Sequence, residues 1–177
     1  MKRNNKFLIA LSTVLLSVSL AGCSSSPNSS KDGVNRTSPD GNEVKVEHAA
    51  IKLAKNAEKN KYKLIDAEGV KKVIDAKEDV VIVNVIPADR FASTKIPNAV
   101  NAFLPKKLDE VKPEEKENFL KQLGDNKDKK IIVYCGYVEC DRSDVGAKLA
   151  IDAGYKNVYR FPGGIAAWLD AGNSVAK

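Results

Sequence analysis

The chain has 177 residues, of which 43% are hydrophobic and 29% are charged, and its formal net charge at pH 7 is +6. The first 22 residues hold three basic and no acidic side chains, so the rest of the chain, with 26 basic and 23 acidic side chains, has a net charge of +3. Its lysines alternate with acids, as in KPEEKENFLK, which is typical of a solvated surface and argues against a nucleic-acid partner.

The N-terminus has the pattern of a secretory signal. Three basic residues, Lys2, Arg3 and Lys6, precede the apolar run FLIALSTVLLSVSL, which is too short to span a bilayer comfortably. The sequence LAGC follows and ends at Cys23. It resembles the lipobox of bacterial lipoproteins, and this resemblance implies a signal peptide at residues 1–22 and diacylation of Cys23. The lipid would anchor the protein to the cell membrane on its extracytoplasmic face. An ordinary signal peptide with an incidental cysteine is the alternative.

A polar segment follows this cysteine. Residues 24–42 read SSSPNSSKDGVNRTSPDGN and contain one aliphatic side chain, Val34, so they cannot bury enough apolar surface to fold. We therefore expect residues 23–43 to be a flexible tether. Residues 44–177 are sufficient for a single domain with its own core.

The folded part is predicted to begin with a helix. From Glu43 onward the apolar residues share one helical face, which consists of Val46, Ala49, Ala50, Leu53 and Ala57. The same helix carries His48, the only histidine of the chain, which we interpret as a surface residue because no cysteine lies near it in the sequence. Asp66 then caps a short helix whose apolar face is Val70, Val73 and Ile74.

Strands and helices alternate through the rest of the chain. The β-branched run VVIVNVI at residues 80–86 predicts a strand that is covered on both faces. It is followed by a turn and short strand at IPNAVNAFL, a helix between Pro113 and Gly124, and a second buried strand at KKIIVYC. DRSDVGAKLAIDAG then predicts a helix, KNVYRF a strand and GGIAAWLDAG a last helix. This order predicts an α/β fold with a mainly parallel central sheet and helices on both faces.

The second buried strand ends at Cys135. Ligands of parallel sheets bind beyond the carboxyl ends of the strands, and the loop at this end leads into a helix that begins near Arg142. Backbone N–H groups of the loop, the helix dipole and the charge of Arg142 would stabilise a thiolate at Cys135 and make it a nucleophile. A buried structural cysteine is the alternative interpretation.

Several motifs resemble the rhodanese family. The segment IIVYC…RS…AKLAIDAGYKNVYRFPGGIAAW is similar to the catalytic strand and helix of that family, followed by its GY-x-NV strand at Gly154–Val158 and its GG-x-x-x-W helix at Gly163–Trp168. Upstream, KEDVVIVNVIPADRFASTKIPNAVNA looks like the first core strand of the family and the turns after it. The resemblance covers roughly residues 62–172 and implies a rhodanese-like fold for the domain at 44–177.

The resemblance also implies a reaction. In the family, a strand-end cysteine takes sulfane sulfur from a small donor, becomes a persulfide and passes the sulfur to a thiol acceptor, a small molecule or a protein, with no cofactor and no metal. Cys135 matches this nucleophile. The implied substrate-binding loop consists of Gly136, Tyr137, Val138, Glu139, Asp141, Arg142 and Ser143. We therefore predict a sulfurtransferase that acts outside the cytoplasm.

The loop departs from the family pattern in charge and length. It is longer than the common loop, and it carries Glu139 and Asp141 where many members that use anionic donors have basic residues. Repulsion by these carboxylates predicts weak use of thiosulfate. The D-V-R that follows the first core strand in the family is replaced by Asn84 to Ile86, which removes a charge pair near the loop.

A second cysteine, Cys140, lies in the same loop, as it does in some rhodanese-like domains. It is a possible resolving thiol that forms a disulfide with Cys135, a second sulfur carrier, or a bystander. Because Cys135 ends the strand, we expect its sulfur to point into a ring of loop amides and to have the depressed pKa. Two cysteines alone do not make a zinc site, which needs about four ligands.

Three other functions are alternatives to sulfur transfer. A dithiol/disulfide oxidoreductase would use Cys135 and Cys140, and a non-catalytic rhodanese-like binding module would use neither. The cell-cycle phosphatases share the fold, but they have an arginine at the sixth position after the cysteine. This chain has Asp141 there, which argues against phosphate binding.

Overall fold

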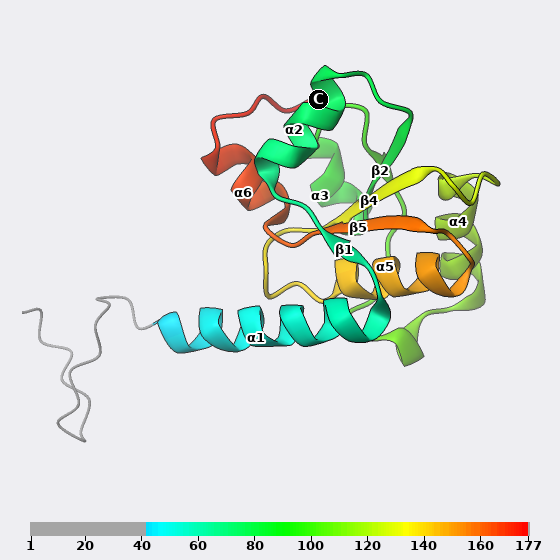
Figure 1. Ribbon diagram of the computed structural model, residues 1–177, viewed down its shortest axis with the longest axis horizontal. Coiled ribbons are helices and arrows are strands. Elements are labelled where there is room, and N and C mark those ends of the chain that lie inside the picture. Colours follow the sequence, from blue (N-terminus) through cyan, green and yellow to red (C-terminus); the bar gives the residue numbers. More distant parts are fainter. Residues whose placement is uncertain (1–41, 177) are drawn as a thin grey trace, which may run out of the picture. The chain divides into compact units, whose positions relative to one another are not determined.

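The computed structural model describes residues 42–176, which fold around a five-stranded sheet in which every neighbouring pair of strands is parallel (Figure 1). The strands lie in the order β1-β5-β4-β2-β3. Their bounds are β1 Lys63–Leu64, β2 Val80–Asn84, β3 Val100–Asn101, β4 Lys130–Tyr134 and β5 Asn157–Phe161. The predicted α/β class with a parallel sheet is confirmed, and β4, which leads to Cys135, lies at the centre of the sheet.

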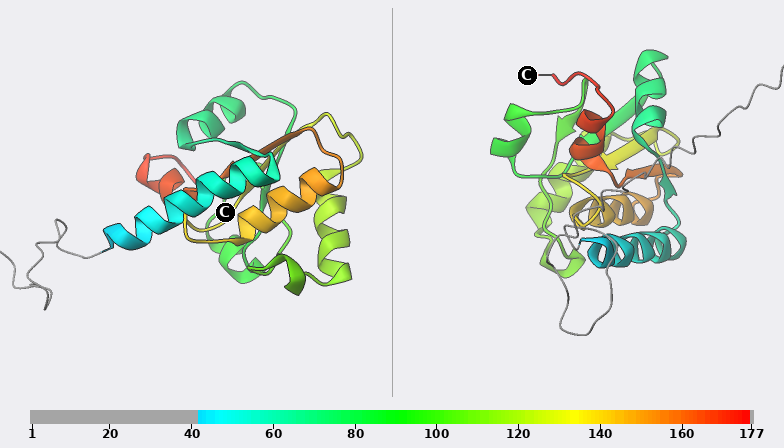
Figure 2. Two further views of the ribbon diagram at one scale, coloured as in Figure 1. Left: turned by 60° about the horizontal axis from the view of Figure 1, so that its bottom comes forward. Right: turned by 90° about the vertical axis from the view of Figure 1, so that its left-hand side faces the viewer.

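Helices connect the strands, because parallel strands require crossover connections. Their bounds are α1 Glu43–Asn60, α2 Ala67–Asp75, α3 Ala88–Ser93, the 3₁₀ helix η1 Leu108–Glu110, α4 Pro113–Leu123, α5 Arg142–Asp152 and α6 Gly164–Asp170. Helices α1, α4 and α5 cover one face of the sheet, and α2 and α6 cover the other, as Figures 1 and 2 show. The prediction of helices on both faces is confirmed.

The apolar core has two halves, one on each face of the sheet, and β4 supplies side chains to both. Ile131 and Val133 pack with residues of α4 and α5, and Ile132 and Tyr134 pack with residues of α2 and α6. All four side chains are fully buried. Burial on both faces explains why this strand is a continuous apolar run in the sequence.

Local sequence signals set several of the element ends. Asp66 accepts a hydrogen bond from Gly69 N over 2.8 Å and caps α2, as predicted. Pro113 begins α4 and Gly124 follows its last residue. The strand predicted over residues 80–86 is shorter, because β2 ends at Asn84, where the side-chain oxygen accepts a hydrogen bond from Ile86 N over 2.8 Å and turns the chain.

Two expectations about the elements need correction. The apolar face predicted for α1 is wrong in part, since Val46 is 52% exposed and Ala50 is also exposed. The other three members of that face are partly buried, namely Ala49, Leu53 and Ala57. The helix packs on α5, where Asn56, which is not in the predicted face, donates to Asp144. The sequence patterns do not indicate β1 or α3, which are too short for hydrophobic periodicity to reveal them.

The predictions for the N-terminus fall outside the described residues. They concern the signal peptide at 1–22, the acylated Cys23 and all of the tether except residues 42 and 43. Among residues 42–176, no helix is both long enough and apolar enough to cross a membrane.

Candidate active site in the two-cysteine loop

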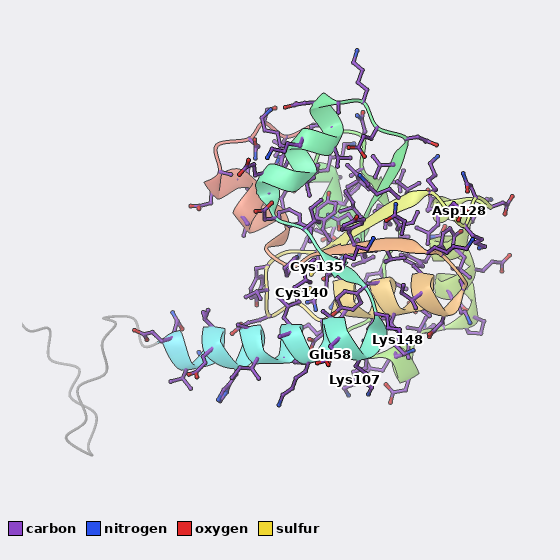
Figure 3. The ribbon with its side chains drawn as sticks, in the orientation of Figure 1. Glu58, Lys107, Asp128, Cys135, Cys140 and Lys148 are labelled. Atoms are coloured by element: carbon purple, nitrogen blue, oxygen red, sulfur yellow. The ribbon has the colours of Figure 1, made fainter. Side chains whose placement is uncertain are left out.

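Cys135 directly follows β4, and the loop that it begins runs to the start of α5 at Arg142. A tight turn closes the middle of the loop, with Cys140 N donating to Tyr137 O over 3.0 Å. Figure 3 shows that Cys135 and Cys140 lie close together beside the start of α5. The predicted arrangement of strand, loop and helix is therefore confirmed.

The first turn of α6 is hydrogen-bonded to the start of the loop. Ile165 N donates to Cys135 O and Ala166 N donates to Gly136 O, each over 3.0 Å. This close approach requires glycine at position 164, where φ is +57° and a Cβ atom would lie 2.2 Å from Cys135 O. The GG-x-x-x-W motif thus has a physical role, which is to bring α6 against the cysteine loop.

The sulfur of Cys135 lies in the interior. The residue is 0% exposed, and its Sγ lies 3.1 Å from Cys140 O and 3.3 Å from Ser143 Oγ. Burial, together with the hydrogen bond from this thiol to Cys140, raises the pKa of Cys135 well above its ordinary value, although Ser143 opposes this effect. The expectation that Cys135 has the depressed pKa is therefore wrong.

The loop stabilises a thiolate at Cys140 instead. A hydrogen bond from the Cys135 thiol and others from the backbone N–H groups of Arg142 and Gly136 lower the pKa of Cys140 to about 6, against the opposing effect of burial. The charge of Arg142 acts in the same direction. Two of the loop amides thus point at the second cysteine, where we expected them to surround the first.

A buried arginine, which the sequence interpretation missed, holds the end of the cysteine loop. Arg160 on β5 is 2% exposed, and its Nε donates to Ser143 Oγ over 2.9 Å. A second guanidinium nitrogen donates to Cys140 O over 3.2 Å, and a third lies 3.7 Å from the carboxylate of Asp144. The arginine therefore fixes the end of the loop to the first turn of α5. A charged residue inside the strand KNVYRF was the available signal.

Residues of helix α1, and Tyr62 just after it, also bond to this polar network. Asp144 accepts hydrogen bonds from Asn56 Nδ2, over 3.0 Å, and from the Tyr62 hydroxyl. Burial, and then the hydrogen bond to Asp144, raises the pKa of Tyr62, which therefore acts as a hydrogen-bond donor. At the surface, Lys52 Nζ lies 2.7 Å from Asp141 Oδ2. These contacts fasten α1 to the loop and to α5.

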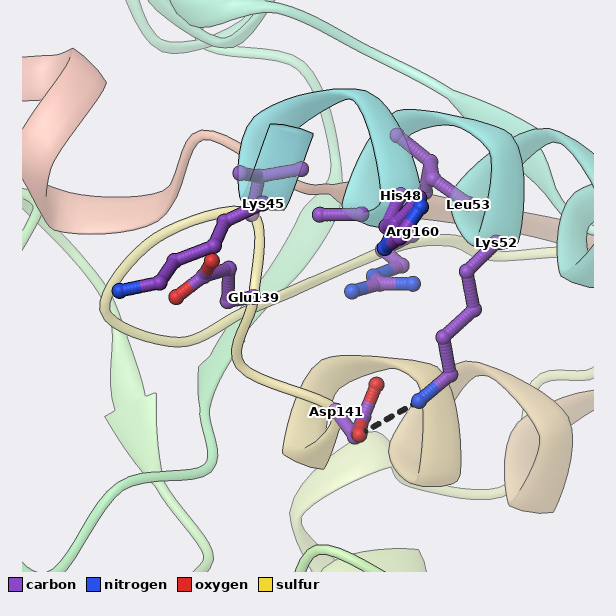
Figure 4. A pocket seen from close by; sticks show the side chains of 9 residues that line it. Lys45, His48, Lys52, Leu53, Glu139, Asp141 and Arg160 are labelled. Carbon is purple, nitrogen blue, oxygen red and sulfur yellow. Dashed lines mark hydrogen bonds and ion pairs between the residues drawn. The ribbon is translucent and has the colours of Figure 1, made fainter. Parts of the chain in front are cut away.

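A cavity of about 290 Å³ separates α1 from the loop; we call it the α1 cavity. Figure 4 shows Lys45, His48 and Lys52 of α1 on one side and the two loop carboxylates on the other. Those carboxylates are Glu139 and Asp141. His48 is exposed, as predicted, but it lines this cavity beside the cysteine loop.

A second cavity, of about 460 Å³, is lined by other residues of the loop; we call it the mouth cavity. Cys140 lines it together with the cationic side chains of Arg90, Lys106 and Arg142, and Asp89 is its one carboxylate. None of the three cations forms an ion pair with a carboxylate of residues 42–176. The loop carboxylates that were expected to form an acidic rim at the sulfur site, Glu139 and Asp141, line the α1 cavity and not the cavity beside Cys140.

The predicted site residues thus occupy three different places. Gly136, Tyr137, Cys140 and Arg142 line the mouth cavity, Val138, Glu139 and Asp141 line the α1 cavity, and Cys135 and Ser143 are buried between them. Within the described residues, no group of three or more His, Cys, Asp or Glu side chains is placed to hold a metal ion.

Solved structures with a similar fold include two sulfurtransferases. Thiosulfate sulfurtransferase from Pseudomonas aeruginosa is 21% identical with a TM-score of 0.55; the match covers 68% of this chain but only 21% of that one. The polysulfide-sulfur transferase homodimer from Wolinella succinogenes is 18% identical with a TM-score of 0.55, over 76% of this chain and 92% of that one. The BH2092 protein from Bacillus halodurans is 22% identical with a TM-score of 0.54, and the match covers 72% of this chain and 85% of that one. At these identities the likeness shows the fold alone.

No match was found among curated proteins. The family model of the rhodanese-like domain matches residues 66–171, which include β2 to β5, the cysteine loop and Arg160 but neither α1 nor β1. The match spans more than half of the chain, and together with the parallel sheet and the strand-end cysteine it shows that this chain belongs to the rhodanese-like domain family.

Proposed function

We propose that the protein is a sulfurtransferase that carries sulfane sulfur as a persulfide on Cys135 and passes it to a thiol acceptor. Membership of the rhodanese-like family supports sulfur transfer as the general role. The observation that carries the proposal is the pair of neighbouring cysteines at the carboxyl end of β4, where Cys135 Sγ lies 3.1 Å from Cys140 O and the buried guanidinium of Arg160 holds the end of the loop. The backbone N–H groups of Gly136 and Arg142 and the charge of Arg142 favour an anionic sulfur at Cys140.

The proposed reaction consists of two displacements. A cysteine thiolate attacks the sulfane sulfur of the donor, the bond between that sulfur and the donor fragment breaks, and the fragment leaves with the electron pair. The thiolate of the acceptor then attacks the outer sulfur of the persulfide and regenerates the cysteine thiolate. Neither step needs an oxidant, a metal or a cofactor.

The reaction is proposed to take place outside the cytoplasm, at the cell membrane. The N-terminal pattern of a basic start, an apolar run and LAGC ending at Cys23 supports a lipid anchor on the extracytoplasmic face. The proposed partners are a small sulfur donor and a thiol acceptor, with no role for nucleic acid.

Intact-protein mass spectrometry tests this function. The reduced full chain is exposed separately to thiosulfate, polysulfide and mercaptopyruvate, and its mass is compared with that of the Cys135→Ala, Cys140→Ala double variant. We expect the wild type to gain one sulfur atom that a thiol reductant removes, and the double variant to gain none. A wild type that gains no sulfur from any of the three donors would rule out the proposal.

A dithiol/disulfide oxidoreductase is the second candidate. It is favoured by the closeness of the two cysteines, since Cys135 Sγ lies 3.1 Å from Cys140 O, and by the lowered pKa of Cys140, about 6, because a thiolate beside a thiol is the arrangement that dithiol exchange uses. In the same mass measurement, this function would appear as the loss of two hydrogen atoms on oxidation, without any gain of sulfur.

A further inference from the structure

The two thiols differ in access to a small molecule. Cys135 is 0% exposed, and its sulfur is surrounded by Cys140 O, Ser143 Oγ and the carbonyl of Tyr137. Cys140 is partly exposed and lines the mouth cavity. A donor that enters this cavity therefore meets the sulfur of Cys140 before that of Cys135.

The groups around the two sulfur atoms also favour Cys140 as the reactive thiol. The carbonyl oxygens of Tyr137 and Cys140 lie near the sulfur of Cys135 and favour a protonated thiol, and of its hydrogen-bond partners only Ser143 opposes this effect. The sulfur of Cys140 receives hydrogen bonds from Cys135 and from the backbone N–H groups of Gly136 and Arg142, and its pKa is lowered to about 6. At neutral pH, the accessible sulfur is thus also the one held as a nucleophilic thiolate.

We propose that Cys140 is the entry thiol of the reaction, which takes the sulfane sulfur from the donor in the mouth cavity and hands it on to the buried Cys135. This inference rests on the proposed function and assigns the first step to a residue other than the strand-end cysteine. Cys140 is then a catalytic residue, because it touches the reacting sulfur, and its role is different from that of a resolving thiol that expels sulfur.

Each step of this relay is balanced. The Cys140 thiolate attacks the sulfane sulfur and forms a persulfide anion, while the donor fragment leaves with the electron pair of the broken bond. The sulfur of Cys135 then attacks the outer sulfur of that persulfide, whose bond to the Cys140 sulfur breaks. The proton of the Cys135 thiol passes to the sulfur of Cys140. The products are a persulfide anion on Cys135 and a thiol at Cys140, so no oxidant or reductant is consumed.

The experiment follows the position of the sulfur with time. The reduced full chain is mixed with polysulfide, quenched at increasing times with iodoacetamide, and digested with trypsin and with a protease that cuts after glutamate. The cut after Glu139 places Cys135 and Cys140 on different peptides, and Cys23 lies on a third. We expect sulfur on the Cys140 peptide at the earliest times and on the Cys135 peptide later.

Two matched variants test the order independently. In Cys135→Ala, sulfur should load on Cys140 and stay there, since no second thiol can accept it. In Cys140→Ala, the rate of loading should fall at least about tenfold, because the remaining thiol is buried and protonated. The wild-type time course alone decides the question if either variant fails to fold.

The outcomes separate the two proposals. Sulfur that appears first on Cys135, with Cys140→Ala loading at the wild-type rate, overturns the entry thiol and leaves the proposed function standing. A wild type that takes up no sulfur overturns both. Sulfur that appears first on Cys140 and then moves to Cys135 supports both.

Discussion

Arg160 Nε donates a hydrogen bond to Ser143 Oγ over 2.9 Å, and both side chains are buried beneath the two-cysteine loop. The same guanidinium donates to Cys140 O and lies near the carboxylate of Asp144. It thus joins strand β5 to the end of the loop and to the first turn of α5. A buried charge held in this way determines both where the loop lies and how stable the domain is.

Replacement of this arginine should destabilise the domain. In Arg160→Met, Asp144 loses its buried cation and Ser143 and Cys140 O lose their donor, so we expect the free energy of unfolding to fall by about 3 kcal/mol. Chemical denaturation of both proteins measures the change. The exposed Arg90 provides the control, since Arg90→Met should change the free energy by no more than about 0.5 kcal/mol. Equal stabilities of the two variants would contradict the network described for Arg160.

Because α6 and the loop lie so close together, adding one methyl group at position 164 should strongly destabilise the domain. In Gly164→Ala the new Cβ would lie 2.2 Å from Cys135 O at a positive φ, so we expect a loss of about 2–4 kcal/mol in stability. Gly172→Ala is the matched control, because φ is also positive at +72° but nothing lies within 4 Å of the added atom. It should cost only about 1 kcal/mol. A melting curve for each variant checks this difference, and similar shifts in both would argue against the steric explanation.

The pKa of Cys140 predicts how alkylation of this thiol depends on pH. Since only the thiolate reacts, and the pKa is lowered to about 6, the rate of alkylation at Cys140 should be slow below this pH and reach its plateau well before pH 8.5, where ordinary thiols are half ionised. Iodoacetamide labelling followed by peptide mapping gives the rate for each cysteine. In Cys135→Ala the midpoint should move up, because the first cause of the shift, the hydrogen bond from Cys135, is lost. A midpoint near 8.5 in the wild type would contradict the assignment.

The cations of the mouth cavity predict a preference for anionic sulfur donors, opposite to the expectation from the loop sequence. The double variant Arg90→Glu, Lys106→Glu should lower the second-order rate of sulfur loading from thiosulfate about tenfold or more, and added salt should reduce the difference. Lys45→Glu is the control for charge reversal, because Lys45 lines the α1 cavity. A similar loss in Lys45→Glu would mean that the donor does not enter through the mouth cavity.

The lipid anchor is tested by removing the acylated residue. Cys23→Ala should release the protein from membranes or block its processing, because the lipid and the cleavage site would both be lost. Fractionation of cells that express each form, with detection of the protein in the membrane and soluble fractions, measures the effect. Unchanged membrane association of the variant would contradict a lipid anchor at Cys23.

Much of the fold could be predicted because it depends on local patterns. The apolar run at β4, the cap at Asp66 and the glycine at position 124 each act within a few residues, and all three appear where the sequence indicated. The two-residue strand β1 could not be predicted, since it exists only because it pairs with β5 in the folded domain. Two residues are too few to show a hydrophobic periodicity in the sequence.

The site was predicted less completely, because its properties depend on contacts between distant residues. Arg160 bonds the Tyr62 hydroxyl, 98 positions away, and no local pattern identifies such a partner. The charges of Glu139 and Asp141 were evident in the sequence, but the side of the loop that they face depends on α1, which holds Asp141 through Lys52. The pKa order of the two cysteines likewise depends on which loop carbonyls and amides point at each sulfur.

The central claim, that this chain carries sulfane sulfur and transfers it, is tested most directly by a single cycle of loading and discharge. The reduced full chain is loaded with polysulfide, freed of excess donor and mixed with a thiol acceptor, while intact-protein mass spectrometry follows the protein and the acceptor. We predict that the protein gains one sulfur atom on a loop cysteine and loses it as the persulfide of the acceptor appears. A protein that takes up no sulfur and only alternates between dithiol and disulfide would contradict this account.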